Sequence, residues 1–252
     1  MAEARSGGKG RKRHVQQLLF NHGGKRRGAG RKPKSERAGE AHAKRKDIDG
    51  RDALHVVLRV APEVGNLRRN ATYQAVRAAT EVAARRGRFR ICQLSIQRTH
   101  IHMIAEAEDA MALAHGMQGF EISAARNINT ALGTGGRRRK GRVFVDRYHV
   151  VVIRSPKQMR RALSYCLNNF RKHREDRGGT PSTWLLDPFS SAVSFDGWKE
   201  LEGMTEAWQL PGTYRPLVVS PAQSWLQRVG WKIAGEISAR DVPSARDRPR
   251  AV

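Results

Sequence analysis

Two histidines separated by a single residue, His100 and His102, are the side chains of this sequence best suited to hold a metal ion. They lie in the β-prone stretch His-Ile-His-Met-Ile-Ala over residues 100–105. Because side chains alternate along a strand, both imidazoles leave the same face, with their Cα atoms about 6–7 Å apart, and can close on one cation. Two histidines on a half-buried strand are also consistent with ordinary polar surface. No cysteine or third histidine lies nearby in sequence to complete a zinc site.

A second pair, Tyr165 and Asn169, lies in the stretch Leu-Ser-Tyr-Cys-Leu-Asn-Asn over residues 163–169. On a helix, residues four apart are neighbours about one turn from each other. A tyrosine phenol is a candidate nucleophile, although its usual pKa of about 10 leaves little phenolate at neutral pH. The amide oxygen next to it can contribute to a metal site and keep ion and nucleophile together. A helical tyrosine flanked by leucines is also consistent with simple packing.

The elements that must position these residues follow from hydrophobic periodicity and turn signals. Strands are expected at 54–60, 89–97, 100–105 and 142–153, and helices at 67–86, 111–132 and 155–174. Ser155 and Pro156 predict the start of the last helix, as N-cap and first-turn proline. The order β-α-β-β-α-β-α predicts an α+β fold. We expect a ferredoxin-like antiparallel sheet (β-α-β-β-α-β) with helices on one face and an added C-terminal helix carrying the tyrosine.

The charge of the chain indicates a polyanionic partner. Its 252 residues include 48 Lys and Arg against 23 Asp and Glu, a formal net charge of +25. Each phosphate that a cation neutralises releases counterions, which favours binding. Residues 1–50 are expected to form a disordered basic arm, because 15 basic and three acidic residues precede position 47 and the stretch 23–34 has no apolar period. The arm is either a solubilising tail or a segment that follows a DNA groove through Arg26, Arg27, Arg31 and Lys32.

Composition also disfavours other classes of protein. No apolar run approaches the roughly 18 residues that cross a bilayer, and the first residues show no apolar stretch typical of a secretory signal. Cys92 and Cys166 form no CxxC pair, which is consistent with a reducing cytosol. Residues 179–239, which contain the tryptophans, are expected to be an aromatic-rich extension packed on the core. Residues 240–252 are expected to be a flexible tail.

The two pairs together resemble the HUH single-tyrosine transposases, the insertion-sequence-200-like proteins, and among them look most similar to the REP-associated tyrosine transposases. The similarity extends over roughly residues 20–200. It is carried by Thr99-His100-Ile101-His102-Met103-Ile104, by Phe144-Val145-Asp146-Arg147-Tyr148-His149, by Tyr165-Cys166-Leu167-Asn168-Asn169, by the glycine-rich arm at 23–34, and by Asp187-Pro188-Phe189-Ser190-Ser191 with Phe195-Asp196-Gly197-Trp198. A His-x-His pair is common in isolation, so the specificity lies in its order and spacing relative to the tyrosine helix.

The resemblance implies a catalytic domain over residues 51–178 that cleaves single-stranded DNA at hairpins or repeats and transfers the strands. In such an enzyme His100, His102 and Asn169 bind Mg or Mn, which acts as a Lewis acid on the scissile phosphate. Tyr165 attacks the phosphate, which produces a 5′-phosphotyrosine link and a free 3′-OH. His149 and Asp146 are candidate auxiliary residues, for which phosphate-orienting or structural roles are favoured over catalysis.

Further basic residues are candidate phosphate contacts, although each is also consistent with a solvated charge: Lys140, Arg142, Arg147, Arg160, Arg161, Arg171 and Lys172. His55 is expected to be a core or edge histidine. Two other functions stay open. One is a non-catalytic protein that recognises repeat hairpins and binds them in EDTA; the other is a basic RNA-associated protein that prefers RNA to DNA. As an enzyme, the protein is expected in the bacterial cytoplasm at the nucleoid, as a monomer or homodimer.

Overall fold

The computed structural model describes residues 47–174, 185–203, 212–244, 247 and 249. The chain divides into two compact units, Met1–Ala38 and Gly39–Val252, and every described residue belongs to the second. Only residues 47–50 of the expected basic arm are described. The arm's candidate DNA contacts therefore lie outside the described residues: Arg26, Arg27, Arg31 and Lys32. Within the described part of the chain, no helix is both long and apolar enough to cross a membrane.

Four strands form one antiparallel sheet in the order β2-β3-β1-β4. Their bounds are β1 (Ala53–Arg59), β2 (Phe89–Ile96), β3 (His100–Ala107) and β4 (His149–Ile153), and the intervening helices are α1 (Asn70–Ala84) and α2 (Ala110–Ala131). A tight turn joins β2 to β3, where the Gln97 N–H donates to the His100 carbonyl at 2.8 Å. The predicted ferredoxin-like α+β fold is confirmed by this strand order.

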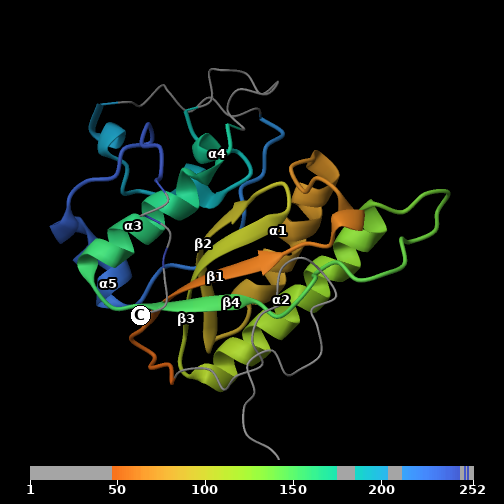
Figure 1. Ribbon diagram of the computed structural model, residues 1–252, viewed down its shortest axis with the longest axis horizontal. Coiled ribbons are helices and arrows are strands. Elements are labelled where there is room, and N and C mark those ends of the chain that lie inside the picture. Colours follow the sequence, from red (N-terminus) through yellow and green to blue (C-terminus); the bar gives the residue numbers. More distant parts are fainter. Residues whose placement is uncertain (1–46, 175–184, 204–211, 245–246, 248, 250–252) are drawn as a thin grey trace, which may run out of the picture. The chain divides into compact units, whose positions relative to one another are not determined.

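Different helices cover the two faces of the sheet, because successive side chains of each strand point to opposite sides. On β3, Met103 packs into the core formed with α1 and α2, whereas Ile104 packs with Leu163 of α3 (Pro156–Leu167). Figure 1 shows the sheet between α3 on one side and α1 with α2 on the other. His100 and His102 share the parity of Ile104. The histidine pair therefore faces the helix that carries the tyrosine.

The fourth strand is shorter than the apolar pattern of residues 142–153 predicts, and that prediction is wrong for its first half. Only His149–Ile153 pairs regularly with β1, beginning with His149 opposite Val57. Upstream, a single bridge joins Val60 to Phe144. From Phe144 to His149 the β4 side advances five residues (149 − 144 = 5), whereas the β1 side advances only three from Val57 to Val60 (60 − 57 = 3). The two extra residues interrupt the ladder, as in a β-bulge.

The tyrosine helix begins where the sequence predicts and ends earlier. The Ser155 hydroxyl accepts the N–H of Gln158 at 3.3 Å, which caps the first turn of α3. In place of one helix to residue 174, α3 ends at Leu167 and a short helix, α4 (Asn169–Lys172), follows. The N–H of Asn168, between them, still donates to the Ser164 carbonyl at 3.0 Å. This helical bond keeps Tyr165 and Asn169 about one turn apart.

The described part of the expected aromatic-rich extension contacts α3. It contains short helical segments: η3 (Ser191–Ser194), η4 (Lys199–Gly203), α5 (Trp225–Arg228) and η5 (Gly230–Ala234). Trp198 and Trp231 are buried in the same cluster as Leu163 of α3, whereas Trp225 is 57% exposed. Two aromatic rings of the extension thus pack in one buried cluster with apolar side chains of α3.

Two buried carboxylates join the extension to the rest of the domain through hydrogen bonds. Glu106 of β3 is fully buried and accepts the backbone N–H of Ser224 at 2.8 Å and the side-chain N–H of Gln227 at 2.9 Å. Asp187 accepts two hydrogen bonds from Arg68, both 2.9 Å long, and 0% of its side chain is exposed. Buried charges persist in proteins when they are paired and hydrogen-bonded in this way. Each carboxylate therefore holds the extension in place.

Candidate active site

The histidine pair of β3 lies on the sheet face that α3 covers, with His102 buried and His100 partly buried. His102 is 2% exposed, and its ring centroid lies 4.6 Å from that of His100. The two rings are nearly perpendicular, with an interplanar angle of 88°. The strand therefore places both imidazoles on one face and in contact.

The phenol ring of Tyr165 meets these imidazoles within the same chain. Its centroid lies 5.3 Å from the His102 ring and 6.1 Å from the His55 ring, edge-on to both. The Lys172 ammonium lies 4.7 Å from the centroid of the same phenol ring, a cation–π contact. Tyr165 itself is only 5% exposed. The candidate nucleophile thus lies against a candidate metal ligand, with a positive charge beside it.

Asn169 lies one helical turn beyond Tyr165 and is fully buried. Neither atom of its side-chain amide has a hydrogen-bond partner among the described residues. Two turns beyond Tyr165, the His173 ring lies 5.8 Å from the His100 ring. Asn169 is thus bracketed along the helix by two residues that both contact the histidine pair. Asn169 therefore lies between these two residues along the chain.

These residues fit a divalent metal ion. A buried amide without partners is rare, since leaving it unsatisfied destabilises a fold, and an oxygen ligand to a cation is one way to satisfy it. Among the described residues, no group of three or more His, Cys, Asp or Glu side chains is arranged to hold a metal. A site built on His100 and His102 would therefore draw a third protein ligand from a side chain of another kind, such as the buried Asn169 amide.

The sequence did not identify two further histidines that contact this site. His55 of β1, expected to be a core or edge residue, is 1% exposed, and its Nε2 lies 3.2 Å from Nδ1 of His102. His173 was not considered at all, and it contacts His100. The register of β1 on β3 determines the first contact, and the helical spacing from Tyr165 could have suggested the second.

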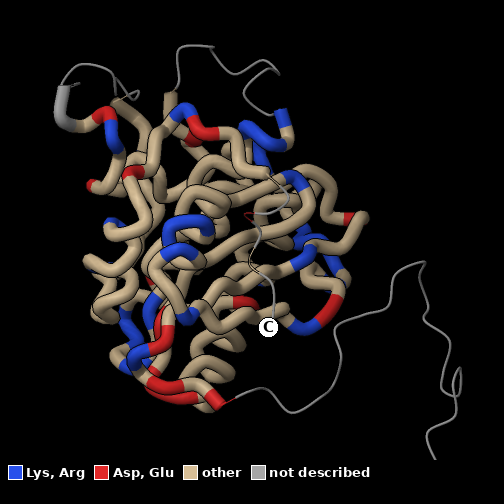
Figure 2. Tube along the Cα trace, turned by 60° about the vertical axis from the view of Figure 1, so that its left-hand side comes forward, with Lys and Arg blue, Asp and Glu red and all other residues tan. Residues whose placement is uncertain are grey.

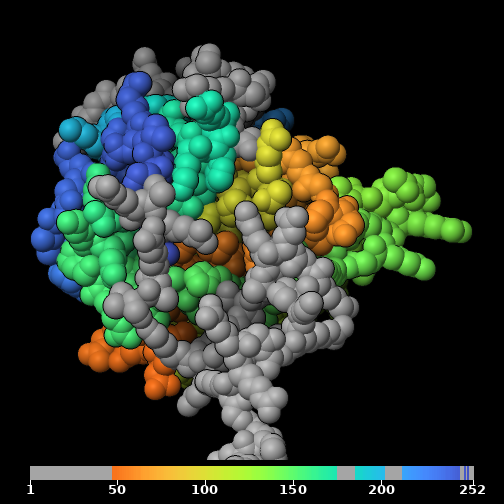
Figure 3. Space-filling view, in the orientation of Figure 1, coloured from red at the N-terminus to blue at the C-terminus, as the bar shows by residue number. Residues whose placement is uncertain are grey.

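The candidate DNA contacts Lys140 and Arg142 lie in the loop between α2 and β4. A bridge between Thr134 and Arg137 closes a turn with glycines at 135 and 136, both at positive φ. Figure 3 shows the side chains of this loop projecting at the right of the molecule. Among the described residues, neither Lys140 nor Arg142 forms an ion pair. Their charges are available to a polyanion.

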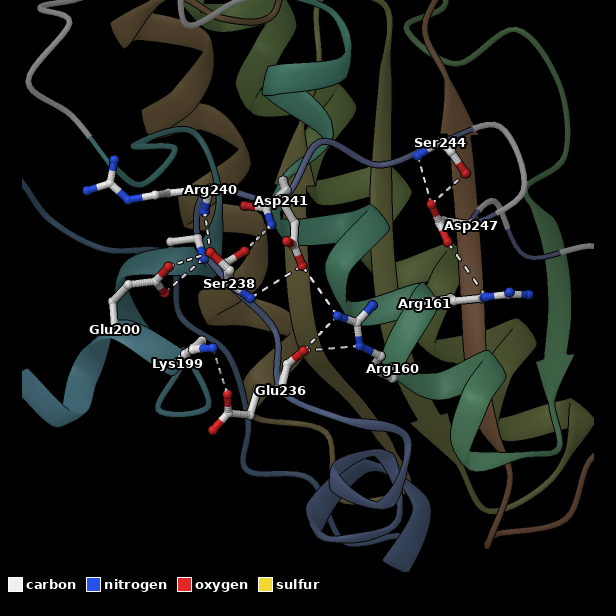
Figure 4. A network of polar contacts seen from close by, with 12 residues as sticks. Arg160, Arg161, Lys199, Glu200, Glu236, Ser238, Arg240, Asp241, Ser244 and Asp247 are labelled. Carbon is white, nitrogen blue, oxygen red and sulfur yellow. Dashed lines mark hydrogen bonds and ion pairs between the residues drawn. The ribbon is translucent and has the colours of Figure 1, made fainter.

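Three other candidate DNA contacts are engaged with the C-terminal segment 236–247, as Figure 4 shows for two of them. Arg160 donates to the Glu236 carbonyl at 2.6 Å, and Arg161 pairs with Asp247 at 3.6 Å. Arg171 donates to the Ala239 carbonyl at 2.8 Å. In the same segment, the Ser238 hydroxyl donates to Glu200, which anchors the segment to η4. In this arrangement the arginines hold α3 and α4 to the end of the chain.

The remaining candidates lie at the edge of the sheet. His149, the first residue of β4, is half-buried and pairs with Val57, which in turn pairs with His102 on its other side. Two strand spacings, about 9–10 Å, therefore separate the backbones of the two histidines. Asp146 accepts the N–H of Arg147 at 2.8 Å in the irregular approach to β4. Figure 2 shows basic and acidic positions interspersed over several elements of the described chain.

Neither cysteine is suited to be a nucleophile. Both are buried, and burial raises the pKa of the Cys92 and Cys166 thiols far above its ordinary value. A thiol reacts as the thiolate, which these environments disfavour. Tyr165 is therefore the better candidate nucleophile on this face.

Residues 52–169 match the family model described as Transposase IS200 like. The matched stretch contains all four strands and the histidine pair, and it ends at Asn169. The matched family is the one that the motifs indicated. No curated protein sequence gives a significant match. One similar solved chain is described as the structure of the REP-associated tyrosine transposase bound to a REP hairpin; it is 16% identical, with a TM-score of 0.46, and the match covers 72% of this chain and 100% of that one.

Proposed function

We propose that this protein cleaves and rejoins single-stranded DNA through a 5′-phosphotyrosine intermediate, with hairpin-forming repeats as its substrate. One observation carries the proposal. The Tyr165 ring lies 5.3 Å from the His102 ring, and the neighbouring Asn169 amide is buried without a partner. The contact of the candidate nucleophile with one imidazole, and the unpartnered amide one helical turn away, support the proposal in a stretch that matches the IS200-like family model.

His100, His102 and Asn169 would hold the divalent ion, Mg or Mn. When bound, the ion supplies a Lewis acid that stabilises the negative charge developing on the phosphate oxygens. Nitrogen ligands suit Mn better than Mg, whereas the amide oxygen suits both. Lys172, whose ammonium lies 4.7 Å from the Tyr165 ring centroid, adds a positive charge beside the phenol ring.

In the proposed reaction the Tyr165 oxygen attacks the phosphorus and loses its proton. The bond from phosphorus to the 3′ oxygen breaks, and that oxygen takes up a proton to become a 3′-OH. The new phosphotyrosine bond replaces the broken phosphodiester, so that attack by a 3′-OH reverses the step without an external source of energy. Burial of Tyr165 keeps water away from the bond before rejoining.

A single chain holds both halves of the proposed site, since Tyr165 contacts His102 of its own chain. We therefore expect the monomer to be active, at the bacterial nucleoid where chromosomal repeats lie. Lys140, Arg142 and Arg147 would bind the phosphates of the substrate, because they form no ion pair within the described residues.

The test is covalent capture of a hairpin oligonucleotide labelled at its 3′ end, because the downstream fragment keeps the phosphate that joins tyrosine. The parent protein with Mn²⁺ should give a labelled band in a denaturing gel, and Tyr165→Phe should give none while binding the hairpin as tightly. Tyr148→Phe is the matched control and should still form the adduct. An equal adduct in Tyr165→Phe would remove Tyr165 from its role. Binding without any adduct in the parent protein would instead favour a non-catalytic hairpin-binding protein.

A further inference from the structure

We propose that His55 is a positioning residue that holds the His102 imidazole in the orientation and tautomer required of a metal ligand. The inference rests on the proposed function, because it assigns His102 to the metal. His55 lies on β1, a strand that carries none of the proposed metal ligands.

The pairing of β1 with β3 brings the two histidines together. His55 lies opposite Ile104, and Val57 lies opposite His102. His55 and His102 are therefore diagonal neighbours on the face covered by α3, close enough for long side chains to touch. The next side chains of β1 on this face, Ala53 and Val57, are apolar. A histidine in such a row is tolerated only when its nitrogens find hydrogen-bond partners.

The geometry of the pair is that of a hydrogen bond between two buried rings. His55 Nε2 and His102 Nδ1 lie 3.2 Å apart, and the ring centroids lie 5.3 Å apart with an angle of 17° between the ring planes. The two residues are 1% and 2% exposed. Both rings are thus held in place, and rotation of either would break the contact.

This bond has two possible directions, and only one suits a metal ligand. A neutral imidazole has one N–H and one nitrogen with a free lone pair. If His55 donates, the proton of neutral His102 must lie on Nε2, which then has no lone pair for a cation. If His102 donates from Nδ1, its Nε2 lone pair is free to bind the metal. The His55 Nε2 acceptor therefore selects the competent tautomer, as the hydrogen-bond partners of metal-bound histidines do in general.

His55 also contacts the nucleophile. Its ring lies 6.1 Å from the Tyr165 ring, edge-on at 87°. The same side chain thus contacts a metal ligand and the attacking residue. Replacing it should alter metal affinity as well as the position of the phenol.

The experiment measures Mn²⁺ binding to the full chain without DNA, by isothermal titration calorimetry. His55→Phe keeps an aromatic ring and removes the acceptor, so Mn²⁺ affinity should fall about 10- to 100-fold. His55→Gln retains an acceptor and should recover most of that loss. His115→Phe, on the exposed surface of α2, is the matched control and should bind like the parent.

A spectroscopic measurement on the unmutated chain is independent of whether the variants fold. In the Mg²⁺-saturated protein, two-dimensional ¹⁵N–¹H spectra of the histidine rings should show His102 protonated at Nδ1. An Nε2–H tautomer of His102 would overturn the inference, as would parent-like Mn²⁺ affinity in a folded His55→Phe variant. If the parent itself binds no Mn²⁺, the proposed metal site fails rather than the role of His55.

Discussion

Replacing Asn169 by leucine should make the metal-free protein more stable while removing its response to metal. The amide is fully buried, and both of its polar atoms lack partners among the described residues. Leaving a buried polar group unsatisfied destabilises a protein by about 1–3 kcal/mol. Leucine has a similar shape and no polar atoms. We therefore expect Asn169→Leu to raise the free energy of unfolding in EDTA by about 1–3 kcal/mol.

Bound Mn²⁺ should make the parent the more stable of the two proteins. A ligand at 100 times its dissociation constant stabilises the native state by about 2.7 kcal/mol. The parent should gain that amount from Mn²⁺, and Asn169→Leu should gain little or nothing because it lacks a ligand. The assay is urea-induced unfolding followed by circular dichroism, in EDTA and at saturating Mn²⁺. In thermal melts, each kcal/mol corresponds to about 2–4 °C for a domain of this size.

Asn168 provides a matched control one residue away. It is also fully buried, but its side-chain N–H donates to the Ser238 carbonyl at 2.9 Å. Asn168→Leu leaves that carbonyl unsatisfied but also removes an Oδ1 atom that has no partner among the described residues, so any change in stability should be the same in EDTA and in Mn²⁺. The reasoning fails if Asn169→Leu is the less stable protein in EDTA, or if Mn²⁺ stabilises it as much as the parent.

Three further changes test other parts of the structure. Arg142→Ala should lower the slope of log K against log salt for hairpin binding by about 1, and an unchanged slope would exclude a phosphate contact. Asp187→Asn breaks the buried pair with Arg68 and should destabilise the fold by about 3–5 kcal/mol in urea unfolding; a loss below about 1 kcal/mol would contradict this. Since burial raises the pKa of the Cys92 and Cys166 thiols, neither should react with Ellman's reagent at pH 8 until the chain unfolds. Their contribution to stability is present below the unfolded pKa of about 8.5 and should be lost as pH rises above it, which alkaline unfolding curves can check.

The sequence predicts the order of elements well because hydrophobic periodicity and capping are local signals. Ser155 marks the start of α3, and the alternation around His100 marks β3. The failure at β4 has a long-range cause. Val143 to Val145 form an apolar, β-prone run typical of a strand. Two extra residues between the Val60–Phe144 bridge and the Val57–His149 pair interrupt the pairing, and no local pattern reveals them.

The site was only partly predictable for the same reason. His-x-His and the spacing of Tyr165 to Asn169 are visible along the chain. The partnership of His55 with His102 depends on the β1–β3 register, which pairs residues 47 positions apart. The role of Arg171 likewise depends on a contact with Ala239, 68 positions away. Before folding is known, such residues look like an ordinary core histidine and a solvated cation.

The supports of the tyrosine helix are synthesised well after the helix itself. The partners of Arg160, Asn168 and Arg171 follow these residues by 76, 70 and 68 positions. On the ribosome, the phenol and the imidazoles are therefore translated well before the segment that holds their helix. The contacts of Arg160, Asn168 and Arg171 with residues 236–239 can therefore form only after translation has passed residue 239. The strands that carry the histidines have been synthesised by then.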